Sequence, residues 1–418
     1  MRTKILNIKK TALVSALLLE LTAGAHAATI NVDGTTCTLN DAVTAADTDT
    51  ATGGCSAGSG ADVLELPIDG NLILAAPTGT INTEVTINGN GSVIDGNDTG
   101  RIFTVQAGGN LTINDSIVTN GVSSTADRNF AGGVRSYDGQ LHINRSTFSE
   151  HVGGAINFTR STGSITDSVI ENNDSYGAAA YYYNGGLTVS SSTVTVSNST
   201  ISGNNTMSGT AGGGGIYVGN FDSAVSLTMT NSTISGNTSV NRGGGISHTD
   251  YGNGSTISLT NVTIIDNTSN VAGGGIANDA STITISQSIV SGNTGTAGSE
   301  VYSSGGTVTV DDFNLFGFNN NAGVVGVTIG ATDIVPTEAN VTGIVDTTLS
   351  DNGGSTPTHA LVTGSPAIDA VPAASCASVT DQTAKNRPID GNVDGTADCD
   401  IGAFENPNPD IIFEDGFE

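Results

Sequence analysis

The chain has 418 residues, a formal net charge of −28, 57 glycines and no tryptophan. Acidic residues outnumber basic ones by 40 to 12. A chain this negative repels nucleic acid and anionic membranes, which excludes functions that depend on binding either.

Residues 1–27 have the pattern of a secretory signal peptide. A basic start is followed by the apolar stretch "ALVSALLLELTAGA", and the small residues "AHA" end at Ala27. The alternative is a short membrane anchor, but this stretch is too short and interrupted to cross about 30 Å of hydrocarbon comfortably. We therefore expect an exported, soluble chain from residue 28, without a membrane span.

The segment "CTLNDAVTAAD", which starts at Cys37, predicts a short amphipathic helix. Thr38 and Asp41 have the spacing of a capping box. The apolar side of this helix carries Leu39, Val43 and Ala46. We interpret residues 37–60 as a cap on the N-terminal end of the fold.

Four cysteines lie in two pairs near the two ends of the chain. An even number in an exported protein indicates disulfides, here Cys37–Cys55 and Cys376–Cys399. Other pairings and a metal site remain open, although neither pair has zinc-like spacing with histidines nearby.

Seven copies of a short line recur at intervals of 22 to 33 residues. The first copy is "INDSIV". The last residues of the seven copies are Val118, Phe148, Ile170, Ile201, Ile234, Ile264 and Val290. An asparagine follows most copies, at Asn173, Asn204, Asn237, Asn267 and Asn293. "GGGI" or a relative then ends at Val134, Ile156, Ile216, Ile246 and Ile276.

Each copy alternates apolar residues with Ser or Thr, which predicts short strands with one buried face. A copy has no room for a connecting helix and cannot bury its apolar face alone, but it can when stacked on its neighbours. The sequence therefore predicts an all-β fold, a parallel β-helix over residues 28–350, with one copy per rung. Glycines would serve the corners, and stacked asparagines would form hydrogen-bonded ladders.

The repeat stops near Asp351, where prolines and cysteines appear. We interpret residues 351–405 as the cap on the other end, stapled by the second disulfide. Residues 406–418 read as a linker and a short tail, "IIFEDGFE", which is too short to anchor in a bilayer.

Several segments resemble known families. The repeats resemble the pectin-lyase-like superfamily of single-stranded right-handed parallel β-helices, and "GGAI" at 153–156 is similar to polymorphic outer-membrane protein repeats. "CTLNDAVTAAD" resembles the CSLREA segment, and "DNGGSTPTHALVTGSPAIDA" with "DCDIGAFE" resembles the end of choice-of-anchor Q domain proteins. The resemblance implies an exported, surface-associated β-helix with no defined reaction.

That superfamily includes pectate lyases and polygalacturonases, so a polysaccharide lyase or glycoside hydrolase is the alternative. Asp311 and Asp312 are the only adjacent aspartates in the rungs, and no histidine or basic motif of the polygalacturonase type follows them. We assign no catalytic residue. We expect a non-catalytic protein for adhesion, matrix or glycan contact, with a structural surface-layer component as a further alternative.

The residue after each "GGGI" should point outward, because strand side chains alternate. In this reading "AAAYYY", at 178–183, takes the place of "GGGIYV". The outward column then holds Arg135, Asn157, Tyr182, Tyr217, Ser247, Ala277 and Tyr302. We predict that Arg135, Asn157, Tyr182, Tyr217 and Tyr302 form a strip for the sugar rings of an extracellular polysaccharide or surface glycan. The alternative is a solvated strand face, where tyrosine has good β propensity.

The segment "DGNVDGTADCD", from Asp390 to Asp400, resembles the first nine positions of an EF-hand loop. Asp390, Asn392, Asp394 and Asp398 would be the Ca²⁺ ligands. The twelfth position is Ile401 rather than Glu, so an Asp/Gly turn without metal is the alternative.

Overall fold

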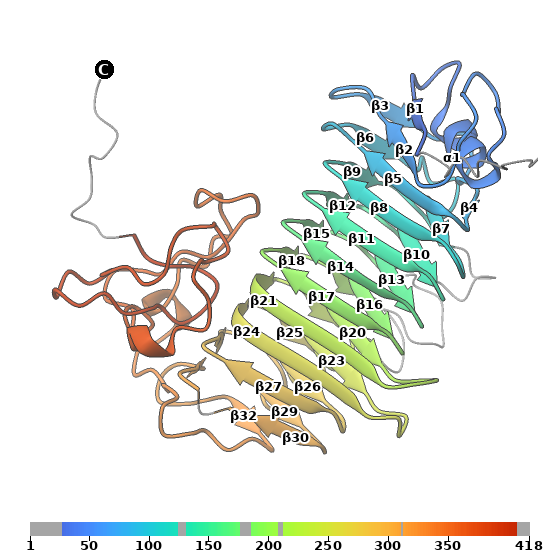
Figure 1. Ribbon diagram of the computed structural model, residues 1–418. Helices are drawn as coiled ribbons and strands as arrows, with labels where there is room; N and C mark the ends of the chain where they lie inside the picture. Colours follow the sequence, from blue (N-terminus) through green and yellow to red (C-terminus); the bar gives the residue numbers. More distant parts are fainter. Residues whose placement is uncertain (1–26, 124–130, 176–184, 208–211, 311, 408–418) are drawn as a thin grey trace, which may run out of the picture.

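The structure is a computed structural model that describes residues 27–407, apart from 124–130, 176–184, 208–211 and 311. The predicted signal peptide and most of the tail lie outside these residues. The described part is a long stack of strands with one α-helix at its N-terminal end and an irregular region along its flank (Figure 1).

The described strands form three sheets. The largest contains β1 (Thr29–Asn31), β2 (Asp62–Glu65), β3 (Asn71–Ile73), β5 (Glu84–Asn88), β6 (Val93–Asp95), β8 (Asn110–Asn114), β9 (Ile117–Thr119), β11 (Gln140–Asn144), β12 (Thr147–Ser149), β14 (Thr162–Thr166), β15 (Val169–Glu171), β17 (Thr193–Ser197), β18 (Thr200–Ser202), β21 (Val225–Ser235), β24 (Ser255–Ile265), β27 (Thr282–Ser286), β28 (Ile289–Ser291), β30 (Thr307–Thr309) and β31 (Leu315–Phe316).

The second sheet contains β4 (Thr80–Ile81), β7 (Phe103–Val105), β10 (Val134–Tyr137), β13 (Ile156–Thr159), β16 (Leu187–Ser190), β20 (Ile216–Gly219), β23 (Ile246–Thr249), β26 (Ile276–Asn278), β29 (Val301–Ser303) and β32 (Val324–Val325). The third contains β19 (Asn205–Thr206), β22 (Thr238–Ser239) and β25 (Thr268–Ser269). The helix is α1 (Leu39–Thr48), and two 3₁₀ turns, η2 (Val341–Gly343) and η3 (Ala373–Ser375), lie near the C-terminus.

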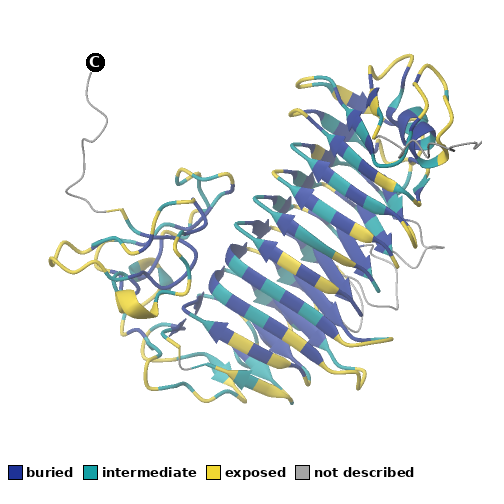
Figure 2. Ribbon diagram, viewed as in Figure 1, coloured by how far each residue is buried: buried dark blue, intermediate teal, exposed yellow. Residues whose placement is uncertain are grey.

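The strand register confirms the predicted parallel β-helix. Each strand pairs in parallel with its equivalent in the next copy, for example Ile234 opposite Ile264. The seven aligned residues form one inward column of Val118, Phe148, Ile170, Ile201, Ile234, Ile264 and Val290, all fully buried. Buried and accessible positions alternate along the strands (Figure 2).

The predicted asparagine ladder is also present, and it explains the glycines. Asn204, Asn237 and Asn267 each donate their side-chain amide to the Oδ1 of the next asparagine at 2.9 Å. The opposite corner of the same rungs carries glycine, because a Cβ on Gly245 would lie 3.3 Å from the Asn267 side chain and 2.7 Å from the Gly275 carbonyl. A Cβ here would therefore clash first with the backbone of the next rung and would also crowd the asparagine ladder.

The N-terminal end is capped as predicted. Helix α1 packs over β4 and β5, and the Thr38 hydroxyl accepts a hydrogen bond from the Asp41 amide at 3.2 Å. The Asp41 carboxylate contacts the Thr38 hydroxyl at 2.7 Å rather than the Thr38 amide, so the box is closed between side chains. Both predicted disulfides, Cys37–Cys55 and Cys376–Cys399, are formed.

The position of residues 351–405 differs from the prediction. This segment, called the flanking lobe below, lies along the outer side of β18, β21, β24 and β28 (Figure 1). Outward hydroxyls in neighbouring rungs hold it: Thr200 donates to the Pro357 carbonyl at 2.6 Å and Thr233 donates to Gln382 at 2.7 Å. A second apolar core, which includes Ile265, Ile289, Val371, Ile401 and Phe404, lies between lobe and stack.

The C-terminal end of the stack is covered by the last rung and the loop that follows it. The residues that pack there against the main core are Val308, Val310, Ala322, Val324, Val327 and Ile329, all only partly buried. Among the described residues, no helix is both long and apolar enough to cross a membrane.

Candidate functional site

Most residues of the predicted ligand strip do pair with one another along one column. The prediction that their side chains are exposed to a ligand is wrong. Arg135 pairs with Asn157, and Tyr217 pairs with Ser247 in the same column. However, Asn157 is 1% exposed and Tyr217 is fully buried, so neither presents a surface to a ligand.

The place given to Tyr182 belongs to Thr188, which pairs with both Asn157 and Tyr217. Tyr182 itself lies outside the described residues. "GGLTVS", not "AAAYYY", is therefore the equivalent of "GGGIYV" in this copy. The last member of the column, Tyr302, is partly exposed and pairs with Ala277.

A groove of about 280 Å³ lies on the outer face of β23 and β26, beside this column. Its lining residues are Asn241, Arg242, Ser247, His248, Thr249, Val271 and Asp279. Val271 supplies an apolar wall that is 40% exposed. The rest of the lining offers hydroxyl, amide, guanidinium and carboxylate groups from two successive rungs, so the groove has hydrogen-bond donors and acceptors side by side.

Arg242 and Tyr302 come together at the rim of this groove. The guanidinium carbon lies 5.4 Å from the centre of the Tyr302 ring, within the range of a cation–π contact. Arg145, Arg160 and Arg387 each pair with a carboxylate. Within the described residues, no carboxylate lies within ion-pair distance of Arg242.

His248 lies at the floor of the groove, where it is 3% exposed. Its Nε2 is 3.1 Å from the Ser255 hydroxyl. Burial lowers the pKa of His248 to about 4, despite the opposing effect of Asp250 and Asp279. The imidazole is therefore neutral at neutral pH and is a weak proton acceptor.

A second pocket of about 230 Å³ lies where the asparagine ladder ends. Asn293 donates its side-chain amide to Glu300 Oε2 at 2.6 Å, and its backbone amide donates to the same oxygen at 3.2 Å. Glu300 is 1% exposed, and burial raises its pKa to about 8. Asn319 and Phe318 close the other side of the pocket.

Three side chains of the proposed calcium loop accept hydrogen bonds from backbone amides. Asp390 accepts hydrogen bonds from the amides of Asp394 and Gly395 at 3.1 and 3.0 Å. Asp398 accepts one from Ala373 at 2.8 Å, and Asn392 accepts one from Asp394 at 2.9 Å. In the part of the chain that is described, no group of three or more His, Cys, Asp or Glu residues is arranged to hold a metal ion. Calcium binding stays a prediction.

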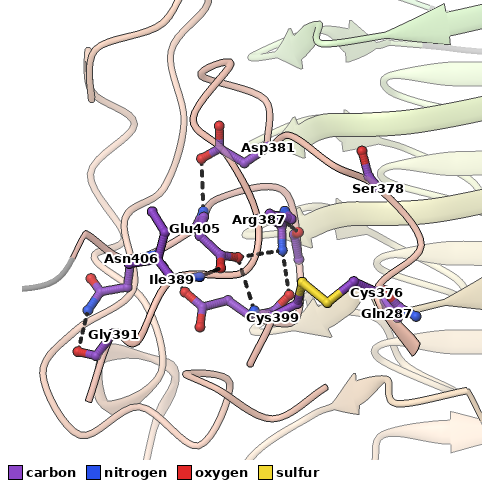
Figure 3. A network of polar contacts seen from close by, with 12 residues as sticks. Gln287, Cys376, Ser378, Asp381, Arg387, Ile389, Gly391, Cys399, Glu405 and Asn406 are labelled. Atoms are coloured by element: carbon purple, nitrogen blue, oxygen red, sulfur yellow. Dashed lines mark hydrogen bonds and ion pairs between the residues drawn. A yellow bond between two sulfur atoms is a disulfide. The ribbon is translucent and has the colours of Figure 1, made fainter. Parts of the chain in front are cut away.

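The flanking lobe has a buried ionic centre next to its disulfide (Figure 3). Arg387 lies 2.9 Å from Glu405, with both side chains fully buried, and also donates to the carbonyls of Asp400 and Gly402. Burial, with the nearby Glu405 charge, raises the pKa of Asp400 to about 8. The Arg387 guanidinium and the Glu405 carboxylate are paired with each other, which is consistent with a structural role.

The groove was missed at the sequence level. Arg242 and Asp279 lie 37 positions apart in the numbering, and Tyr302 follows 23 positions later. These three residues come together because they lie at nearby positions on successive rungs of the stack. The available signal was Arg242 itself, which is the one Arg or Lys between residues 161 and 384.

Comparison with known proteins gives a fold likeness alone. No family model matches the chain, and no curated protein matches it. Among solved structures, it is similar to a crystal structure of pectate lyase Pel9A, with 15% identity over 82% of this chain and 88% of that chain, at a TM-score of 0.39. The parallel β-helix itself is established by the strand register.

Proposed function

We propose that this chain is an exported, non-catalytic β-helix protein that binds a neutral glycan in the groove over β23 and β26, for adhesion or matrix contact. The observation that carries the proposal is Arg242, which packs on Tyr302 at the groove rim without a carboxylate partner among the described residues.

The chemistry of the groove suits sugar hydroxyls, which both donate and accept hydrogen bonds. Arg242 donates, Asp279 accepts, and Ser247 and Thr249 can do either. The partly exposed ring of Tyr302 offers a face to the C–H groups of a pyranose, because the ring face is electron-rich. A neutral chain is favoured over a polyanion, because the protein has a net charge of −28.

Export is supported by the signal-like residues 1–27 and by two disulfides, which persist mainly in oxidising compartments. A non-catalytic role is supported by His248, whose low pKa and contact with Ser255 make it a poor general base. The alternative, a polysaccharide lyase or hydrolase, rests on Arg242 and Asp279 sharing one groove.

The test is titration calorimetry of the purified protein with neutral oligosaccharides (cello-, xylo- and manno-series) and with galacturonate oligomers. We expect binding of a neutral series, lost in Arg242→Ala and Tyr302→Ala. Arg145→Ala is the matched control, because Arg145 is exposed and pairs with Asp115 beside the largest sheet, away from the groove. New reducing or unsaturated ends would favour the enzyme. Absence of binding to every probe, or binding indifferent to Arg242, would overturn the proposal.

A further inference from the structure

The pocket at the end of the asparagine ladder has a buried carboxyl at its floor. Glu300 is 1% exposed and Asn293 is 5% exposed, whereas Thr294, Asn319 and Asn321 form an exposed rim. The volume of about 230 Å³ is far above the roughly 10–15 Å³ that a single water needs, so the pocket has room for a small organic molecule. It shares no lining residue with the groove over β23 and β26.

The rim of the pocket is preformed. Phe318 and Asn321 exchange backbone hydrogen bonds of 3.2 and 2.9 Å across a two-residue turn. The central residues of this turn, Asn319 and Asn320, have φ values of +53° and +58°, as a type I′ turn requires. The Asn319 amide also donates to the Glu338 carbonyl at 2.7 Å. A rim held in this way loses little conformational entropy when a ligand binds.

The floor presents a carboxyl without a cationic side chain. Among the described residues that line the pocket, none is Arg, Lys or His. Both hydrogen bonds from Asn293 to Glu300 come from neutral amides. Burial, with a smaller contribution from the charge of Asp266, raises the pKa of Glu300 to about 8, so this carboxyl is mostly protonated at neutral pH. A cation in the pocket would supply the opposite charge and stabilise the carboxylate.

The rest of the lining indicates which kind of cation fits. Phe318 suits an organic cation, because the face of an aromatic ring attracts positive charge. Thr294, Ser299 and Asn319 add hydroxyl and amide groups that can bond to a hydroxyl of the ligand. A divalent metal fits less well, because the described part of the chain holds no group of three or more His, Cys, Asp or Glu residues arranged for one. The net charge of −28 attracts cations in general.

We propose that this pocket binds the primary ammonium of a small amino alcohol, with Glu300 as the counter-ion and Phe318 beside the charge. On binding, the ammonium donates a hydrogen bond to the Glu300 carboxylate, and the proton that this carboxyl carried passes to solvent. The carboxylate keeps both hydrogen bonds from Asn293. Binding is therefore coupled to proton release, and the affinity increases with pH until Glu300 is ionised without the ligand. The site is independent of the proposed glycan groove.

The test is titration calorimetry of the full chain with ethanolamine, a primary alkylamine that stays charged between pH 6 and pH 8. At pH 7 we expect release of about one proton per ligand, measured from the dependence of the heat on the ionisation enthalpy of the buffer. The affinity should be about tenfold higher at pH 7 than at pH 6. Ethylene glycol, which is similar in size and uncharged, should not bind. No binding of ethanolamine, binding without proton release, or equal binding of ethylene glycol would each overturn the proposal.

Three variants separate the site from general attraction of cations. Glu300→Gln keeps an acceptor for Asn293, and it should bind ethanolamine about tenfold or more weakly and without proton release. Phe318→Leu should weaken binding about two- to fivefold and retain proton release. Glu171→Gln is the matched control, because Glu171 is also partly buried with a raised pKa but is separated from the pocket by the rungs of β18, β21 and β24. An equal loss of binding in Glu171→Gln and Glu300→Gln would mean that net charge alone attracts the amine, and would overturn the site.

Discussion

The side-chain amide of Asn293 donates a 2.6 Å hydrogen bond to Glu300, and this contact ends the ladder that begins at Asn173. Glu300 replaces the glycine of earlier copies, because Gly275 and Glu300 both precede the paired residues Ile276 and Val301. Its carboxyl fills the space that the next asparagine would use. At the other end, the Asn173 Oδ1 accepts the His151 amide at 3.0 Å.

Glu300 gives the fold a pH dependence. Its pKa is raised by burial to about 8, so the neutral carboxyl contributes stability that is full below about pH 4.5 and is lost as pH rises through 8. Glu300→Gln keeps an acceptor for Asn293 and removes the titration. We expect this variant to be more stable than the wild type at pH 9 and similar to it at pH 4.5, as measured by urea unfolding. Parallel curves for the two proteins across this range would contradict the assignment.

Removing one ladder member should be costly. In Asn237→Ala, the backbone and side-chain amides of Asn204 lose their shared acceptor, and the Ile201 carbonyl loses a donor. Buried groups left unsatisfied in this way should lower the free energy of unfolding by about 3 kcal/mol. Asn144→Ala is the control, since the Asn144 side chain lies on the accessible face and donates a 3.0 Å hydrogen bond to Asn114. An equal decrease in the free energy of unfolding in both variants would mean that the ladder contributes no more to stability than an accessible asparagine pair.

Gln382 should decide how firmly the flanking lobe is docked. Its side chain accepts from Thr233 at 2.7 Å and donates to Thr200 and Thr356 at 2.9 Å. In Gln382→Ala we expect faster amide hydrogen exchange across residues 351–405 and unchanged exchange in β8 and β11. The exposed Gln106→Ala should change neither. Unchanged exchange in the lobe would show that its apolar core alone holds it.

Calcium is tested by thermal melting with millimolar Ca²⁺ against chelator. If the Asp390–Asp398 loop binds, the wild type should gain about 2.7 kcal/mol of stability at 100 times the dissociation constant, and Asp394→Ala should lose that gain. Asp351→Ala is matched, because Asp351 accepts an amide two residues ahead at 2.9 Å, as Asp394 does. Identical melting of the wild type in both buffers would leave the loop as a turn.

The repeat made the architecture predictable, because Ile234 and Ile264 had to face the same interior and Asn237 and Asn267 the same corner. Local patterns also predicted α1 and both disulfides. Alternation along a strand could not reveal that Tyr217 is buried, since the pattern shows which side chains point outward but not what covers them. Nor could it place the lobe, whose contacts with Thr200 and Thr233 join residues about 150 to 180 positions apart.

Glu300 also marks the position beyond which the repeat cannot be extended. A duplicated copy inserted between residues 266 and 267 would find glycine and asparagine at every position it needs, and would lengthen the stack by one strand spacing of about 4.8 Å. A copy added after residue 300 would meet a carboxyl where its asparagine must go. Evolution or design can therefore lengthen this protein by inserting copies inside the repeat. The position of the last rung is set by one side chain, that of Glu300.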